Sequence, residues 1–301
     1  MFNELLKYRS MKVIITKIVL IVCLFVSMDT NAQNPFITKA DVIFQFDISP
    51  DAKWACCSWW GADAISKIRI KKLGTQKVID IDSLNMRTES VFYGISFLSE
   101  DQLIFAKGKA LFLYDFRKWH HSKLLDLPDS FVSNITVSKD GTAIYFVCNN
   151  DICLADVKKG ILNKKRIGHD VVRDISVTVD NQLIYSIIIG IGSKSTTQIW
   201  IWDGKNQVSN LTEQFLKEIK APYIVKATSN PNLYIVAGEG GIFSFDKVAQ
   251  KATKLVDVAK DRVVEIRIND ADNTIYYLTY YHKAVIKTMN MDRKQEKSIS
   301  F

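Results

Sequence analysis

Cysteine, histidine and proline are scarce in this chain of 301 residues, which contains 5 cysteines, 4 histidines and 5 prolines. No Cys-x-x-Cys motif occurs, and the histidines lie far apart except for the adjacent pair His120 and His121. A zinc site needs several such ligands at short, regular spacings. We therefore expect neither a metal site nor a cofactor.

Long clusters of positive charge are also missing, although the formal net charge is +8. The lysines and arginines are dispersed along the chain, which is typical of a solvated rim rather than a nucleic-acid patch. The alternative is attraction to an anionic envelope glycan or lipid surface. We expect no nucleic-acid partner.

The N-terminal region has no apolar run long enough to span a membrane. Residues 11–32 combine a basic start, an apolar core at residues 18–26 and a small-residue end, as in a secretory signal peptide. A bilayer-spanning helix needs about 20 apolar residues, so a membrane anchor is the less favoured alternative. Lipidation at Cys23 is another, although Val22 is larger than such processing prefers. We expect translation from Met1 or Met11, removal of residues 1–32, and a periplasmic or extracellular mature chain without a transmembrane span.

Residues 138–156 follow a plan that recurs along the chain. A Ser-x-Asp-Gly turn precedes an apolar run, a short polar turn and a second apolar run that ends at Asp156. Two such runs joined by a tight turn predict a β-hairpin. The first turn occurs six times along the chain, at Asp51, Asp101, Asp140, Asp180, Pro231 and Asp272.

These repeats predict the fold. Each unit supplies one strand before the turn, such as residues 42–48, then the hairpin, then an outer strand such as residues 253–256. Four antiparallel strands in about 40 to 45 residues make one propeller blade. We therefore expect an all-β chain in which residues 33–301 form one six-bladed β-propeller domain. Either residues 33–39 join the last blade and close the ring, or that blade forms its own fourth strand from residues 297–301.

Two further local patterns have structural interpretations. Residues 210–220 predict a short helix with Asn210 as its cap and Glu213 three positions later. An aspartate also ends the third strand of five units, where its carboxylate can accept backbone N–H groups and close the next turn. We expect a structural and not a catalytic role for Asp115, Asp156, Asp203, Asp246 and Asp292.

The four cysteines beyond the predicted signal peptide form two pairs in sequence. If Asn150 and Asp151 form a two-residue turn, Cys148 and Cys153 face each other in a hairpin, close enough for a disulfide in an oxidising compartment. The alternative is two buried thiols. Cys56 and Cys57 are adjacent on a strand, so they point to opposite faces of the sheet.

The motifs SPDAKW at residues 49–54 and SKDGTAIYF at residues 138–146, with the strand-end aspartates, resemble the WD40-like repeats of TolB and dipeptidyl-peptidase propellers. The resemblance spans most of residues 33–301. It implies a propeller that binds proteins or peptides, or one that precedes an α/β-hydrolase domain. No Gly-x-Ser-x-Gly motif is present, and the sequence stops at Phe301, which leaves no room for that domain. We therefore do not expect the peptidase activity.

Aromatic residues concentrate in two loops of the predicted ring. The loops between second and third strands of the blades emerge on one face, and surface loops on a rigid scaffold commonly bind ligands. Blades one and six are neighbours across the closure, and aromatic rings with a few polar groups suit peptides, partner proteins or sugars. The alternative is that a tryptophan packs between blades and the tyrosines finish strands. The candidate ligand-binding residues are Trp59, Trp60, Asp63, Tyr280, Tyr281 and His282.

We expect an exported, non-enzymatic propeller that binds a protein, a peptide or an envelope glycan through these two loops. One alternative is a propeller-type hydrolase or lyase that uses loop carboxylates and His282. Another is a stand-alone propeller related to prolyl-oligopeptidase-like peptidases but without the catalytic domain.

Overall fold

The computed structural model describes residues 42–60, 66–81, 94–128, 132–167, 170–190, 195–258, 262–271, 273–281, 283–292 and 295–299. Residues 39–189 and 196–301 form one compact unit; the other, residues 1–38 and 190–195, is described only at Gly190 and Ser195. The predicted signal peptide, residues 1–32, lies outside the described residues. Within them, no helix has the length and apolar character needed to cross a membrane.

The larger unit contains six sheets of four antiparallel strands, each sheet built from one continuous stretch of chain. The first three are β1 (Val42–Ile48), β2 (Trp54–Trp60), β3 (Ser66–Lys72) and β4 (Val78–Asp80); β5 (Ile95–Phe97), β6 (Gln102–Lys107), β7 (Ala110–Asp115) and β8 (His120–Asp126); and β9 (Val132–Val137), β10 (Ala143–Cys148), β11 (Asp151–Asp156) and β12 (Gly160–Lys165).

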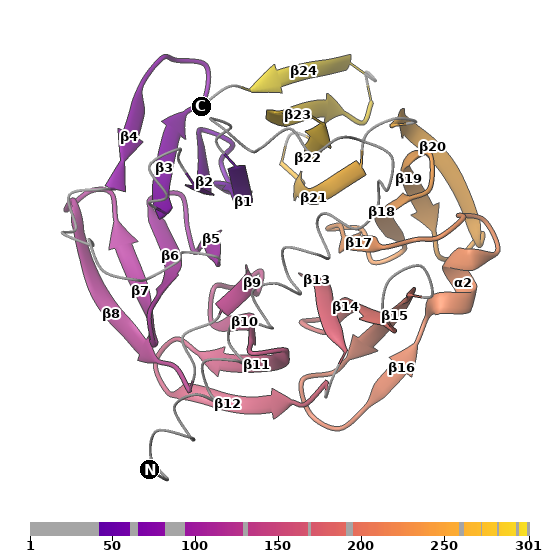
Figure 1. Ribbon diagram of the computed structural model, residues 1–301, viewed down its shortest axis with the longest axis horizontal. Coiled ribbons are helices and arrows are strands. Elements are labelled where there is room, and N and C mark those ends of the chain that lie inside the picture. Colours follow the sequence, from indigo (N-terminus) through magenta and orange to yellow (C-terminus); the bar gives the residue numbers. More distant parts are fainter. Residues whose placement is uncertain are drawn as a thin grey trace, which may run out of the picture. The chain divides into compact units, whose positions relative to one another are not determined.

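The last three sheets are β13 (Val171–Val177), β14 (Leu183–Ile189), β15 (Thr196–Trp202) and β16 (Val208–Asn210); β17 (Ile224–Ala227), β18 (Leu233–Gly238), β19 (Gly241–Asp246) and β20 (Lys251–Asp257); and β21 (Arg262–Asn269), β22 (Thr274–Tyr281), β23 (Lys283–Asn290) and β24 (Gln295–Ile299). They follow one another as the blades of a propeller, with the first strand of each blade nearest the middle (Figure 1). The predicted six-bladed, all-β fold is confirmed.

Six hydrophobic clusters of described residues hold the blades together, and each cluster joins two consecutive blades. The sixth contains Phe46 and Cys57 from the first blade with Tyr276 and Leu278 from the last. Both faces of each blade are therefore apolar, which is why the middle strands read as nearly continuous apolar runs. Burial of one such large side chain contributes about 1.5 to 3 kcal/mol relative to its exposure.

The last blade forms its own fourth strand. β24 pairs with β23 from Ile286 opposite Ile299 to Asn290 opposite Gln295. The prediction that the last blade forms its own fourth strand near the end of the chain is therefore confirmed. The alternative concerned residues 33–39, which lie outside the described residues. Among the described residues, the first and last blades meet through hydrophobic packing and side-chain contacts.

Four of the five strand-end aspartates close the following turn as predicted. Asp156 Oδ1 accepts the backbone N–H groups of Lys158 and Lys159, at 2.8 and 2.9 Å. Asp115, Asp203 and Asp246 each accept two backbone N–H groups in the same way. The carboxylate of Asp292 accepts the side-chain amide of Asn273 at 2.7 Å, and residues 293–294, which follow it, lie outside the described residues.

The predicted hairpin register around the second cysteine pair is wrong. Asn149 and Asn150 have φ values of 50° and 68° and form the turn, so Cys148 lies opposite Asp151 and Cys153 opposite Phe146. Asparagine tolerates this left-handed conformation, and a two-residue turn with two positive φ values matches the twist of the flanking strands. The two cysteines are buried thiols, diagonal to each other on one face and not directly opposed.

Two other local predictions meet different outcomes. Cys56 and Cys57 belong to different interblade clusters, which confirms that they point to opposite faces. The predicted helix is shorter than residues 210–220: α2 spans Thr212–Leu216. The predicted cap is wrong, because the N-cap residue is Leu211, which makes no side-chain capping hydrogen bond. The Asn210 side chain, one residue before it, accepts the N–H of Thr212 at 2.9 Å.

Candidate functional site

The structure places the predicted aromatic residues at matching positions of two adjacent blades. Trp59 and Trp60 end β2, and Tyr280 and Tyr281 end β22, so their predicted placement in loops is wrong and all four lie at strand ends. Their backbones are described, but their side chains lie outside the described set, as do Asp63 and His282 entirely. Because β2 and β22 are the second strands of neighbouring blades, their ends lie at the same end of the propeller.

Strand register connects this end of the propeller with the innermost strands. Trp60 lies opposite Val42, the first residue of β1, and Tyr280 lies opposite Arg262, the first residue of β21. In an antiparallel pair, the end of one strand meets the start of the other. The residues that begin the innermost strands therefore share one end of the molecule with the candidate aromatic residues.

The innermost strands also carry charged residues that sequence analysis did not single out. Seven charged side chains on β1, β13, β17 and β21 interact with one another electrostatically or by direct contact, and we call them the axial cluster. The axial cluster consists of Asp47, Arg173, Asp174, Lys226, Arg262, Glu265 and Arg267.

Carboxylates of the axial cluster accept backbone N–H groups from the innermost strand of the next blade. Glu265 accepts the N–H of Phe46 at 2.9 Å, and Asp47 accepts that of Phe97 at 2.8 Å. An inner strand has a hydrogen-bonded neighbour on one side only, so its other N–H groups need acceptors. Side chains of the preceding blade supply them.

Ion pairs connect the last blade to the first within the axial cluster. Arg267 Nη2 lies 2.6 Å from Glu265 Oε1, and Arg267 Nε lies 3.1 Å from Asp47 Oδ1. Asp47 also accepts the hydroxyl of Ser96 in the second blade at 2.8 Å. A charge removed from water is tolerated when it is paired and hydrogen-bonded in this way.

A second ion pair joins the fourth and fifth blades. Lys226 Nζ lies 2.5 Å from Asp174 Oδ1 and donates to the carbonyl of Ile175 at 3.0 Å; both charged side chains are less than 10 % exposed. Three buried polar atoms beside these pairs, Gln45 Nε2, Arg173 Nε and Asp174 Oδ2, have no hydrogen-bond partner among the described residues. Such atoms mark points where a water molecule or a ligand group gains most by binding.

Burial and neighbouring charges shift the pKa values in the axial cluster. Burial raises the pKa of Glu265 to about 7, although Arg267, Lys226 and the Phe46 N–H act in the opposite direction. Burial lowers the pKa of Lys226 against the attraction of Asp174. Burial, assisted by Arg262, also lowers the pKa of Arg173.

The sequence contains a signal for this cluster. In the strands before the repeated turns, charged residues alternate with apolar ones, as in Phe46-Asp47-Ile48 and Ile266-Arg267-Ile268. Period-two alternation normally indicates one solvated face. Here the polar face points toward the innermost edges of neighbouring blades, and only the ring arrangement shows that it is buried.

His120 and His121 are the adjacent histidines of the chain, and no metal site was expected at them. They begin β8, and their ring centroids lie 5.8 Å apart. Among the described residues, no group of three or more histidine, cysteine, aspartate or glutamate side chains is arranged to hold a metal ion. Asp63 and His282 stand outside that comparison.

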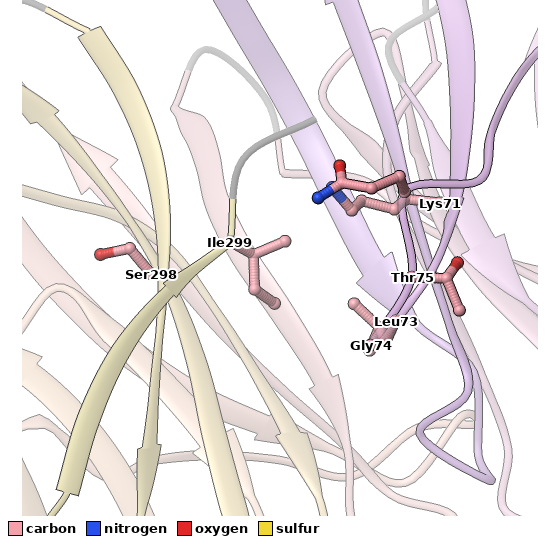
Figure 2. Close-up of a pocket in the computed structure, with 7 residues that line it drawn as sticks. Lys71, Leu73, Gly74, Thr75, Ser298 and Ile299 are labelled. Atoms are coloured by element: carbon pink, nitrogen blue, oxygen red, sulfur yellow. The ribbon is translucent and has the colours of Figure 1, made fainter.

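A pocket of about 270 Å³ lies between the edges of the first and last blades. In Figure 2, Ile299 projects from β24 toward the strand and turn that carry Lys71 and Leu73, whereas Ser298 projects to the other side. Ile299 and Leu73 also pack against the cluster that joins these blades. The pocket is thus part of the junction between the first and last blades. It lies away from the innermost strands, and we assign no ligand to it.

The chain matches no family model and none of the curated proteins. Among solved structures, a chain from the crystal structure of a nidogen/laminin complex has a similar fold, with a TM-score of 0.52 and 12% sequence identity. The match covers 71% of this chain and 80% of the other. This likeness shows a common fold alone. The more specific resemblance to TolB and dipeptidyl-peptidase repeats stays a prediction.

Proposed function

We propose that this protein is an exported binding module, and that it captures a protein or peptide partner at the end of the propeller where β2 and β22 end. Residues 1–32 support export because they have the features of a signal peptide. The binding residues in this proposal are Trp59, Trp60, Tyr280 and Tyr281, with Asp63 and His282 in the adjoining loops.

The observation that carries the proposal is the matching position of the two aromatic pairs. Two consecutive tryptophans and two consecutive tyrosines end the second strands of blades that pack against each other. Tryptophan and tyrosine dominate the binding energy of protein interfaces because they bury large areas with few rotatable bonds. Four such residues at one end of adjacent blades supply the material for an interface core.

The fold supports the same proposal more loosely. A propeller presents loops from several blades at one end of a rigid scaffold, and such loops commonly carry binding residues. The solved structure with a similar fold is titled as a complex of two proteins. A protein or peptide partner is therefore our first choice, ahead of an envelope glycan.

A tryptophan-fluorescence titration tests the proposal. The purified protein is titrated with peptide pools, candidate partner proteins and envelope glycans, beside the Trp59→Ala/Trp60→Ala double variant. We expect saturable binding of a peptide or protein that the double variant loses while it keeps its β-sheet circular dichroism.

Trp119→Ala is the matched control. Trp119 is 57% exposed and lies in the turn between β7 and β8, at the opposite end of its blade from the proposed interface. This variant loses an exposed tryptophan signal but should keep the binding constant. Equal binding by the double variant and the wild type would contradict the proposed site. Catalytic turnover that His282→Ala abolishes in a folded protein would support the enzymatic alternative instead.

A further inference from the structure

Two arginines lie at the end of the propeller where the proposed interface is located. Arg262 is the first residue of β21, directly opposite Tyr280, and it is exposed. Its guanidinium carbon lies 5.4 Å from the centre of the Tyr223 ring. Stacking on an aromatic ring orients an arginine side chain.

Tyr223 is held firmly by three blades. It precedes β17 of the fifth blade, its hydroxyl accepts the N–H of Val263 in the sixth at 3.2 Å, and its carbonyl accepts the hydroxyl of Ser186 in the fourth at 3.0 Å. Arg262 therefore rests on a platform whose position depends on three neighbouring blades. Preorganised positioning of this kind reduces the entropy cost of binding.

Arg173 reaches the same place from the fourth blade. It occupies the irregularity in β13 between Val172 and Asp174, where one extra residue changes the direction of a side chain. The nearby charge of Arg262 helps to lower the pKa of Arg173. Both arginines also act to lower the pKa of Tyr223, against burial, which raises it. The Nε atom of Arg173 is buried and has no acceptor among the described residues.

We infer that Arg173 and Arg262 bind a carboxylate of the partner, and that the partner segment is an acidic peptide. The inference rests on the proposed function, because it specifies the partner of the same interface. A carboxylate supplies the acceptor that Arg173 Nε lacks, and it relieves the repulsion between two like charges. Arg173 Nε is shielded in the unbound protein, so binding includes a side-chain rearrangement of the kind common at interfaces.

The charges of the axial cluster favour one negative charge over two. Four of its residues are cationic and three are anionic, so the cluster is left with a single excess positive charge when all are ionised. Asp174 and Glu265 both interact with Arg173 and would repel a doubly charged phosphate more than a carboxylate. Bidentate pairing also matches the geometry of arginine to that of a carboxylate.

Selection from a random twelve-residue peptide library tests the inference. Peptides are selected on the wild-type protein, sequenced and measured by calorimetry. We expect them to share an aspartate or glutamate, and we expect its replacement by asparagine or glutamine to weaken binding at least tenfold. The same peptide should bind Arg262→Gln at least tenfold more weakly, and the two changes together should cost little more than either alone.

Arg166→Gln is the control for general loss of positive charge, because Arg166 is an exposed residue beyond the end of β12, outside the axial cluster. It should bind the peptide as the wild type does. Arg173→Gln should behave like Arg262→Gln; if it does not fold, the exposed Arg262 still decides the question.

The outcomes separate this inference from the proposed function. Selected peptides that need Trp59 and Trp60 but share no acidic residue would overturn the inference alone, as would unchanged binding by Arg262→Gln. Failure to select any peptide would overturn the proposed peptide partner and the inference together. Saturable binding of an oligoglucuronate with no peptide binding would identify a glycan and also overturn it.

Discussion

The carboxylate of Glu265 in β21 accepts the backbone N–H of Phe46 in β1 at 2.9 Å, across 219 residues of chain. Its other oxygen pairs with Arg267, which in turn pairs with Asp47 of β1. Together with the hydrophobic cluster between the same blades, these contacts complete the ring. In the described part of the chain, side-chain contacts therefore join the last blade to the first.

Loss of the Glu265 side chain should destabilise the protein strongly. Glu265→Ala leaves the Arg267 charge less compensated in a buried position, and removing one partner of a buried ion pair costs about 3 to 5 kcal/mol. Glu239→Ala is the matched control, because Glu239 pairs with Lys220 on the surface and exposed pairs contribute about 0 to 1 kcal/mol. Urea unfolding at pH 8, where Glu265 is mostly ionised, measures both, and equal losses would contradict the assigned role of Glu265.

Glu265 should also make stability depend on pH. Its pKa is about 7 in the folded protein against 4.5 for the unperturbed group, so between these values the native state holds a proton that the unfolded chain has released. This contribution is therefore fully present below about pH 4.5 and is lost as pH rises to about 7, on the order of 3 kcal/mol in all.

Unfolding free energies of the wild type and Glu265→Gln, measured across pH 4.5 to 8, test this sign. Glutamine keeps the size of the side chain and an acceptor for the Phe46 N–H but does not titrate. The stability of the wild type relative to the variant should fall as pH rises. A difference that is constant, or that grows with pH, would show that Glu265 is ionised throughout.

Gly241 should not accept a side chain. A Cβ atom at this position would lie 2.1 Å from the carbonyl oxygen of Val256, a backbone atom of the paired strand β20. Gly241→Ala must displace backbone and should lower the unfolding free energy by about 3 kcal/mol. Gly74 has positive φ but open space around it, so Gly74→Ala should cost about 1 kcal/mol. Thermal melts that rank the two variants in the opposite order would contradict this account.

The Cys153 thiol should react slowly in the folded protein. Burial raises its pKa to about 12, so little thiolate forms at pH 8, and the thiolate is the reactive species. Labelling with a thiol reagent at pH 8 should be slow in buffer and fast in urea. If two thiols react in urea only after a reductant is added, and this effect of the reductant is absent in Cys148→Ala, the result would instead establish the Cys148–Cys153 disulfide that the sequence allowed.

Local turn chemistry made most of the fold predictable. β1 has the predicted bounds because the turn after it is specified by its own residues: Asp51 accepts the Ser49 hydroxyl at 2.7 Å and the Lys53 N–H at 3.1 Å. The same short signals recur in each unit, so the blade count needed no long-range information. By contrast, the Cys148 register was wrong because the turn could be drawn in two ways that differ by one residue.

The candidate site was predictable only as a set of residue types. Consecutive aromatics at 59–60 and 280–281 marked two segments, and the repeat period placed them on adjacent blades, but the structure shows that they end strands and do not lie in loops. Arg173 and Arg262 were not found, because 89 positions separate them and neither belongs to a motif. Their proximity to Tyr223 depends on three different blades.

The sequence by itself determined the strands, the repeated turns and the number of blades, because these depend on interactions between residues close along the chain. Only the tertiary structure decided how the ring closes and which charges face the inner edges. Those contacts join residues such as Glu265 and Phe46 from opposite ends of the domain. Strand periodicity says that a residue lies on one face of a sheet, but packing of whole blades decides whether water, another blade or a ligand meets that face.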